Sequence, residues 1–201
     1  MLELDTPHGQ ARAHVSRVES PVGALVLGHG SGGGIGSADL AGAARAASAA
    51  ELSVALVEQP YRVAGRRAPA PAGQLDTAWT SVISQLRAGP LEGLPILTGG
   101  RSAGARVACR TAAETGSVAV ICLAFPVHPP GRPEKSRLAE LDGVRVPVLV
   151  VQGESDPFGM PPDGANRTVV RIAGTHSLSG AAVETAVSGW LATAGAWPRS
   201  P

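Results

Sequence analysis

Short runs of apolar, often β-branched residues alternate along the chain with longer alanine-rich stretches of helical periodicity. This alternation predicts an α/β fold, in which a mainly parallel, twisted sheet carries helices on both faces. A hairpin is expected over residues 2–18, with its turn at TPHGQ. Six further runs are predicted as strands, at residues 23–28, 53–58, 94–99, 118–125, 146–152 and 168–172.

Large apolar residues spaced at i, i+3, i+4 and i+7 predict amphipathic helices between these strands. Two buried helix faces are expected from this spacing: Trp79, Val82, Ile83 and Leu86 form one, and Val183, Ala186, Val187, Trp190 and Leu191 form the other. Ser37 stands where it can cap a further helix through about Ala50. The segment 61–73 is rich in proline, glycine and arginine, and is expected to be an exposed connection.

The composition predicts one soluble domain over residues 1–201, with a loose tail from about residue 195. Hydrophobic residues make up 44% of the chain, which is enough for one sizeable core. With 201 residues, the chain is too short for two full domains. The net charge is +1, so nothing calls for a nucleic acid or a membrane surface as partner. The N-terminus lacks the features of a leader and no apolar run approaches a membrane span, so a cytoplasmic location is expected.

Neither the cysteines nor the histidines indicate a metal site or a cofactor. Cys109 and Cys122 lie in apolar surroundings without C-x-x-C spacing, and the five histidines are scattered singly. We therefore expect no metal ion and no cofactor.

Catalytic chemistry is indicated first by the stretch GGRSAGAR at residues 99–106. Ser102 follows a predicted strand and precedes a predicted helix whose first turns consist of small residues. Gly100 and Gly104 flank it in the pattern G-x-S-x-G, which in this context is a nucleophile elbow, a sharp turn that exposes the serine oxygen at the sheet edge. A side chain at either glycine is expected to collide with the neighbouring strand or helix.

A serine hydroxyl requires a histidine as base and a carboxylate that orients this histidine. Asp156 and His176 each follow a predicted strand, so both are expected at the carboxyl edge of the sheet, in the chain order Ser, Asp, His. Taken separately, the aspartate could merely start a turn and the histidine could be a solvated loop residue. Glu154 and Asp163 are rival carboxylates, but Glu154 precedes the turn and Asp163 lies further from the strand end.

A tetrahedral oxyanion requires two backbone N–H donors. We assign one to Ala103, which follows the serine, and the other to Ser31 in the glycine-rich loop 29–34.

The same loop permits a dinucleotide-binding interpretation. Gly28, Gly30 and Gly33 satisfy G-x-G-x-x-G after a strand, and Glu58 stands where an acid could bind a ribose. This alternative is weakened because the predicted helix starts only at Ser37, whereas a pyrophosphate requires the helix N-terminus at the glycines.

The stretches GGRSAGAR, LAFPVHPPGRPE, VQGESDPFG and GTHSL together resemble the α/β-hydrolase superfamily, and within it a branch of small predicted hydrolases of dienelactone-hydrolase-like and KAN type. The resemblance extends from about residue 23 to residue 194. It implies the α/β-hydrolase fold, with Ser102 as nucleophile, Asp156 as acid and His176 as base. Dienelactone hydrolases proper have a cysteine where this chain has Ser102.

The expected pocket is shallow, because residues 126–146 leave no room for a helical lid domain. Arg101, Arg62 and His128 are candidate contacts to substrate, and the arginines would suit an anionic one. Alternatively, these arginines pair with acids or face water, and His128 is an ordinary surface residue.

Arg106, Arg110 and Glu114 are spaced at i, i+4 and i+8, which predicts a solvated helix stripe with an ion pair.

The sequence therefore predicts a serine hydrolase that cleaves a small or carrier-bound carboxylic ester or thioester through an acyl-Ser102 intermediate. The second hypothesis is a binding or scaffold protein that keeps this fold without turnover. A scaffold has no physical need for a serine, a histidine and an aspartate at three strand ends, which favours the enzyme.

Overall fold

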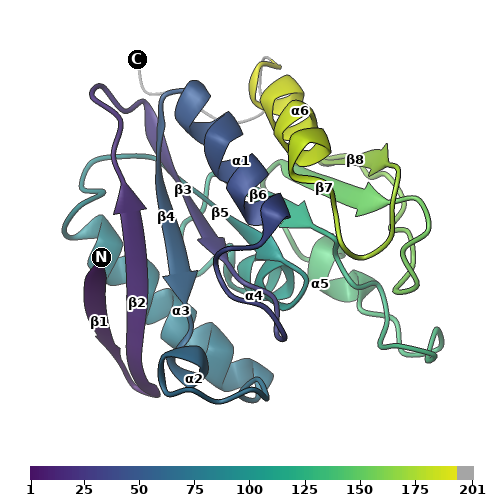
Figure 1. Ribbon diagram of the computed structural model, residues 1–201, viewed down its shortest axis with the longest axis horizontal. Coiled ribbons are helices and arrows are strands. Elements are labelled where there is room, and N and C mark those ends of the chain that lie inside the picture. The colour runs from purple at the N-terminus through teal and green to yellow at the C-terminus, as the bar shows by residue number, and fades with distance from the viewer. Residues whose placement is uncertain (194–201) are drawn as a thin grey trace.

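The computed structural model describes residues 1–193 of the chain, and a single mixed sheet runs through it (Figure 1). Its strands are β1 (Leu2–Thr6), β2 (Gly9–Ser16), β3 (Gly23–Gly28), β4 (Leu52–Glu58), β5 (Ile96–Arg101), β6 (Ala119–Leu123), β7 (Val148–Gly153) and β8 (Arg167–Ile172). They are ordered β1-β2-β4-β3-β5-β6-β7-β8 across the sheet.

Only the N-terminal hairpin is antiparallel in this sheet. Strand β1 pairs with β2 and β2 pairs with β4 in antiparallel register, whereas the strands from β4 to β8 are all parallel to their neighbours. The chain passes from β3 outward to β4 and then returns to the other side of β3 to form β5. Such a reversal of strand order is where open α/β sheets form their sites, at the carboxyl ends of the strands.

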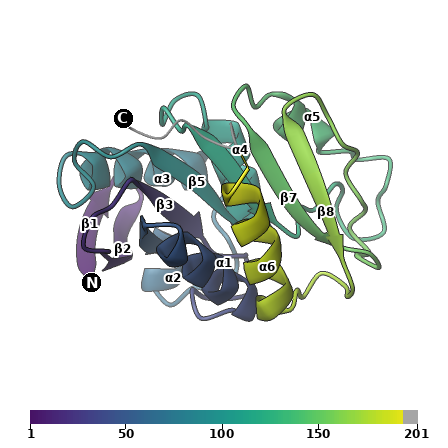
Figure 2. The same cartoon turned by 90° about the horizontal axis from the view of Figure 1, so that it is seen from above.

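Helices cover both faces of the sheet, as the view from above shows (Figure 2). Helices α1 (Ala38–Ala49) and α6 (Gly180–Leu191) lie on one face, and α3 (Ala72–Arg87), α4 (Ala103–Thr111) and α5 (Leu138–Asp142) lie on the other. The short α2 (Pro60–Val63) follows β4 directly. The α/β class predicted from the pattern is confirmed.

Alternate residues of the central strands enter opposite cores, which explains their continuous apolar runs. In β3, Leu25 and Leu27 pack with α1 and α6, whereas Ala24 and Val26 pack with α3. Every residue of β3 is buried, because each face of the strand packs against one of the two cores.

The predicted helix faces and most strand positions are confirmed. The four residues predicted from Trp79 to Leu86 are all buried in α3, and the strand predicted at 23–28 has these limits in the structure. The strand predicted at 94–99 instead spans Ile96–Arg101, because its pairing with β6 continues to Arg101. The strand predicted to reach residue 125 ends at Leu123, since Ala124 adopts a φ of 50°.

Two local predictions need correction. The segment 61–73 is not an exposed connection throughout, because Tyr61 belongs to α2 and is buried. Ser37 does occupy the N-cap position of α1, but its hydroxyl donates to Asp39 Oδ1 at 2.5 Å and caps no backbone N–H. A tertiary contact, from the Tyr61 hydroxyl to the Ser31 carbonyl, overrides the local signal in the first case, whereas a competing local hydrogen bond does so in the second.

The tail predicted to be loose lies outside the described residues, and one domain over 1–201 stays a prediction. Within residues 1–193, no helix combines the length and the apolar character that crossing a membrane requires.

The crossing of α1 and α6 depends on small residues. A Cβ at Gly42 would collide with the carbonyl group of Gly180, so the two backbones approach closely only because residue 42 is glycine. We predict that Gly42→Ala lowers the free energy of unfolding by about 1–3 kcal/mol through overpacking. Denaturant titration would measure this change.

Gly189→Ala is the matched control, since a Cβ at this helical position meets no atom within 4 Å. Alanine there should raise the stability by about 0.5–1 kcal/mol, as it does at exposed helix positions. If Gly42→Ala were as stable as Gly189→Ala, the close contact of the helices would be disproved.

Candidate active site

Ser102 lies in a strained turn between β5 and α4. Its φ of 51° and ψ of −106° fall in a region that non-glycine residues rarely occupy. Two backbone hydrogen bonds hold it there: its N–H donates to the Leu123 carbonyl at 2.9 Å, and its carbonyl accepts from Arg106 N–H at 3.2 Å. The end of β6 and the first turn of α4 therefore fix the direction of the serine side chain.

Three glycines allow this turn to pack against β3. Gly28 lies directly opposite Gly100 in the sheet, and Gly104 lies in the first turn of α4. A Cβ at either Gly100 or Gly104 would collide with the carbonyl oxygen of Gly28. The expectation that both glycines are required by close backbone approach is confirmed.

The structure brings Ser102, His176 and Asp156 into one chain of hydrogen-bond contacts. His176 Nε2 lies 2.9 Å from Ser102 Oγ, and His176 Nδ1 lies 2.9 Å from Asp156 Oδ2. Glu154 and Asp163 are exposed, and the Asp163 carboxylate accepts from Val169 N–H instead. Of the three carboxylates considered, only Asp156 contacts the histidine.

The Asp156 carboxylate is buried and held by two further donors. Its side chain is 1% exposed, whereas that of His176 is 17% exposed. Phe158 N–H donates to Oδ1 at 2.9 Å, and Gln152 Nε2 donates to Oδ2 at 2.8 Å. A fixed carboxylate beside Nδ1 favours the tautomer with its proton on that nitrogen, which leaves Nε2 free to accept the Ser102 proton.

Sequence reasoning missed Gln152 and Phe158. Gln152 is fully buried near the end of β7, four residues before Asp156. A polar residue in the otherwise apolar strand VLVVQG is the sequence signal that could have identified it. The Phe158 ring lies against the imidazole of His176, with ring centroids 4.3 Å apart. Together they restrict the positions of the carboxylate and the imidazole.

Ser31 and Ala103, the two predicted oxyanion donors, line the same pocket as Ser102. Within residues 1–193, neither backbone N–H donates to a protein acceptor. The carbonyl of Ser31 accepts from the Tyr61 hydroxyl at 3.2 Å, which holds this loop against α2. The roles of Ser31 and Ala103 in binding an oxyanion stay predictions.

His29 anchors the same loop as a buried neutral side chain. Its Nδ1 lies 2.8 Å from the Gly30 carbonyl, and its Nε2 accepts from Gln59 N–H at 3.1 Å. Burial lowers the pKa of His29 most strongly and the charge of Arg62 also lowers it, which together outweigh the hydrogen bond to the Gly30 carbonyl and the charge of Glu58, which raise it. Protonation of Nε2 would also remove the hydrogen bond from Gln59.

The dinucleotide interpretation of this loop is not supported. Helix α1 begins only at Ala38, so its N-terminus does not meet the glycines at 28, 30 and 33. Glu58, the candidate ribose ligand, instead contacts His14 of the adjacent strand β2 at 3.0 Å.

Arg101 is largely engaged by the protein itself. Its Nε donates to Asp39 Oδ2 at 2.8 Å, and its Nη2 donates to the His176 carbonyl at 3.2 Å. Arg101 lines the pocket, but Arg62 and His128 do not. Arg62 lies on α2, and the His128 ring turns back to the carbonyl of Pro129 at 2.9 Å.

The predicted stripe of α4 is wrong in its partners and its exposure. Helix α4 ends at Thr111, before Glu114, and Arg106 instead donates two hydrogen bonds to Glu140 of α5, at 2.8 and 2.6 Å. Arg110 donates two to Asp76 of α3, also at 2.8 and 2.6 Å. Both arginines line the pocket of Ser102, so this helix face belongs to the site rather than to solvent alone.

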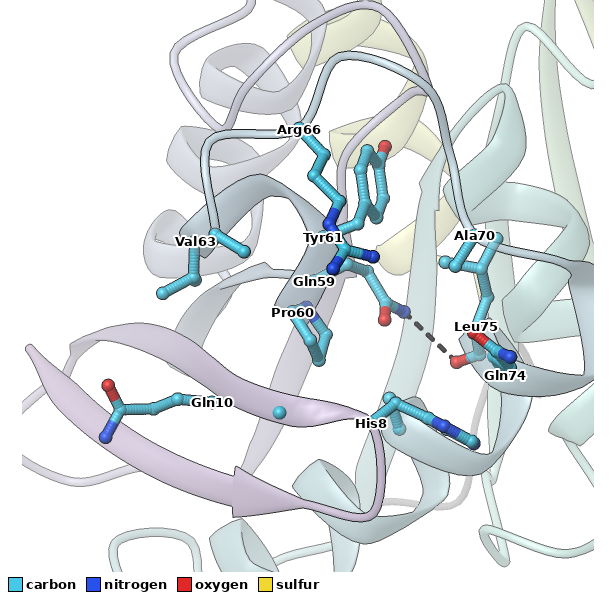
Figure 3. A pocket seen from close by; sticks show the side chains of 13 residues that line it. His8, Gln10, Gln59, Pro60, Tyr61, Val63, Arg66, Ala70, Gln74 and Leu75 are labelled. Carbon is cyan, nitrogen blue, oxygen red and sulfur yellow. Dashed lines mark hydrogen bonds between the residues drawn. The ribbon is translucent and has the colours of Figure 1, made fainter.

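The pocket at Ser102 has a volume of about 510 Å³. A second pocket of about 330 Å³ lies beside it, between the β1–β2 turn, α2 and the start of α3 (Figure 3). The two pockets share Ala70 and Leu75. Gln59 and Tyr61 line the second pocket and also hold His29 and Ser31, so its wall supports the loop of the candidate oxyanion site.

Among residues 1–193, no group of three or more histidine, cysteine, aspartate and glutamate side chains is placed to hold a metal ion.

Comparisons with known proteins agree with this architecture. A family model described as an alpha/beta hydrolase domain matches residues 21–182. No curated protein matches the chain.

Solved structures of low sequence identity share the fold over nearly their whole length. An alpha-beta serine hydrolase homologue from Coxiella burnetii has a TM-score of 0.75 at 19% identity, covering 95% of this chain and 96% of the other. A serine hydrolase without a lid from Xanthomonas campestris has a TM-score of 0.71 at 24% identity, with coverage of 96% and 95%. A dienelactone hydrolase from Anabaena variabilis has a TM-score of 0.71 at 18% identity, with coverage of 94% and 92%. At these identities the likeness shows the fold alone.

The buried His29 should make the stability depend on pH. Its pKa in the unfolded chain is near the ordinary value of 6.5 and is lower in the folded protein. Below pH 6.5 the unfolded chain therefore binds a proton that the folded protein does not, and the free energy of unfolding falls as the pH decreases from 7 through the folded pKa. His29→Gln should reduce this slope by up to about 1.4 kcal/mol per pH unit.

Denaturant titrations between pH 7 and pH 5 would measure the slope, with the exposed His8→Gln as control. The control should keep the wild-type slope. An unchanged slope in His29→Gln would show that His29 is protonated equally in both states.

Proposed function

Because the chain belongs to the alpha/beta hydrolase family, we propose that it is a serine hydrolase that cleaves a small carboxylic ester or thioester. The observation that carries the proposal is the contact chain from Asp156 through His176 to Ser102, which ends at an open pocket. A serine in this arrangement can act as a nucleophile near neutral pH, because the imidazole takes its proton as the oxygen attacks.

In the first half of the reaction, Ser102 Oγ attacks the carbonyl carbon of the substrate while His176 Nε2 accepts the hydroxyl proton. The C–O or C–S bond to the leaving group then breaks as His176 returns that proton to the leaving atom. The products are an acyl-Ser102 ester and a free alcohol or thiol. In the second half, water attacks the acyl carbon with His176 as base, and proton return to Ser102 Oγ releases the carboxylic acid.

In each half of the reaction, negative charge develops on the carbonyl oxygen of the substrate when the tetrahedral intermediate forms. Under this proposal, the N–H groups of Ser31 and Ala103 bind that oxygen, and Asp156 stabilises the imidazolium of His176. Arg101 acts as a positioning residue, since it joins the backbone of His176 to Asp39 of α1.

The site supports small or carrier-bound substrates. In the described chain, the segment between β6 and β7 contains only the five-residue α5 and no lid domain. Two proteins of similar structure, a serine hydrolase without a lid and a dienelactone hydrolase, support the proposal of ester cleavage in an open pocket. We propose no cofactor, because every step uses side chains and backbone groups of the chain.

Hydrolysis of 4-nitrophenyl acetate by four variants tests the proposal. Ser102→Ala and His176→Ala should lose at least about 10⁴-fold in kcat, and Asp156→Asn should lose about 10⁴-fold because the imidazole then adopts the wrong tautomer. Ser177→Ala is the control, since this exposed serine next to His176 makes none of these contacts.

Undiminished turnover by Ser102→Ala would disprove the assignment of the nucleophile. If folded wild-type protein hydrolysed none of a panel of esters and thioesters, the alternative of a binding protein that keeps the fold would be favoured.

A further inference from the structure

The pocket around Ser102 presents arginine side chains and, among the described residues, no carboxylate. Its charged lining consists of Arg101, Arg106, Arg110 and Arg137, together with the imidazole of His176. The acidic partners of these arginines lie behind them rather than on the pocket wall. A substrate entering the pocket therefore meets guanidinium groups.

Three of the four arginines are neutralised by these acids. Arg101 pairs with Asp39, whose side chain is only 3% exposed, and Arg106 pairs with Glu140. The third, Arg110, is held by two hydrogen bonds from its guanidinium to Asp76. Such paired guanidinium groups have fixed directions and little charge left to attract a further anion.

Arg137 is the exception. Within residues 1–193, its guanidinium forms no ion pair and no side-chain hydrogen bond. Glu140, three residues further on, is already shared by Arg106 at 2.6 Å and Arg110 at 3.3 Å. The backbone N–H of Arg137 donates to the Val127 carbonyl at 2.7 Å, which fixes the residue at the start of α5.

The surroundings of Arg137 disfavour its positive charge. Partial burial lowers the pKa of Arg137, and the charges of Arg106 and Arg110 lower it further, while the charge of Glu140 offsets part of this effect. An anion bound in the pocket would reverse both effects, because it would pair with the guanidinium and screen it from the neighbouring arginines. Among the described residues, the structure thus places a partly buried guanidinium without an ion pair in the same pocket as Ser102.

We propose that the substrate is an ester or thioester carrying a carboxylate, and that Arg137 binds this carboxylate while the carbonyl carbon lies at Ser102. This inference rests on the proposed hydrolase function. A guanidinium binds a carboxylate through two parallel hydrogen bonds, which orients the substrate as well as attracting it. Pro126, Pro130 and Phe158 give the same pocket apolar lining, which suits a short hydrocarbon link between carboxylate and ester.

The carboxylate could belong to the acyl group or to the leaving group, and two matched pairs of substrates separate these cases. For the acyl group, mono-4-nitrophenyl adipate is compared with 4-nitrophenyl hexanoate, which has the same chain length and no charge. For the leaving group, 3-acetoxybenzoate is compared with its methyl ester. The measured quantity is the ratio of kcat/KM for the anionic to the neutral member of each pair.

Arg137→Gln should lower this ratio by about 10- to 100-fold for one of the two pairs, as expected for loss of a charge-assisted hydrogen-bonded contact. Arg137→Lys should lower it less, because it keeps the charge but not the paired donors. Arg132→Gln is the control: this exposed arginine belongs to the same segment and does not line the pocket, so the ratio should not change.

Calorimetric binding of adipate to Ser102→Ala tests the anion site without turnover. Adipate should bind Ser102→Ala, and the double variant with Arg137→Gln should bind it about 10-fold or more weakly. If no ester were hydrolysed but adipate binding still required Arg137, the hydrolase assignment alone would fail. The other informative outcome is that esters are hydrolysed while Arg137→Gln changes neither the kcat/KM ratios nor the binding of adipate. That result would disprove the carboxylate site alone.

Discussion

The candidate active site depends on the close backbone contact between β3, β5 and the first turn of α4. Gly28, Gly100 and Gly104 meet there without side chains, and any Cβ at the latter two would collide with the Gly28 carbonyl. This contact allows the chain to turn sharply at Ser102, whose φ of 51° would otherwise be costly. The packing of the core thus supplies the free energy that holds the serine in its exposed direction, and the rest of the site is arranged around that oxygen.

The parallel sheet supplies the other components at the same edge. Strands β7 and β8 end beside β5 and β6 in the sheet order, so the loops that follow them carry Asp156 and His176 to Ser102. Their exact placement depends on contacts from further segments. Gln152 and Phe158 restrict the carboxylate and the ring, and Arg101 connects the histidine loop to α1. The geometry of the candidate site is therefore a property of the tertiary structure and not of the three loops alone.

The fold and the central contacts of the site could be predicted because their signals are local. Alternating apolar runs specify strands, and a serine between glycines at a strand end specifies a turn. The arginines show the limit of this reasoning. The spacing of Arg106, Arg110 and Glu114 indicated a solvated stripe with an ion pair along one helix. In the structure Arg106 binds Glu140 and Arg110 binds Asp76, and each partner is 34 residues away in the sequence. Pairing between distant segments leaves no local pattern, and for the same reason the unpaired state of Arg137 could be recognised only after the partners of its neighbours were known.

The central claim is that Ser102 is the one serine activated by His176. Labelling with a fluorophosphonate, followed by peptide mapping, tests it most directly, because the reagent forms a covalent bond with an activated serine oxygen whatever the natural substrate is. The account predicts a single modified residue, Ser102, in folded wild-type protein, and greatly slowed labelling in His176→Ala. Modification of a different serine, or equally rapid labelling of Ser102 in His176→Ala, would contradict it.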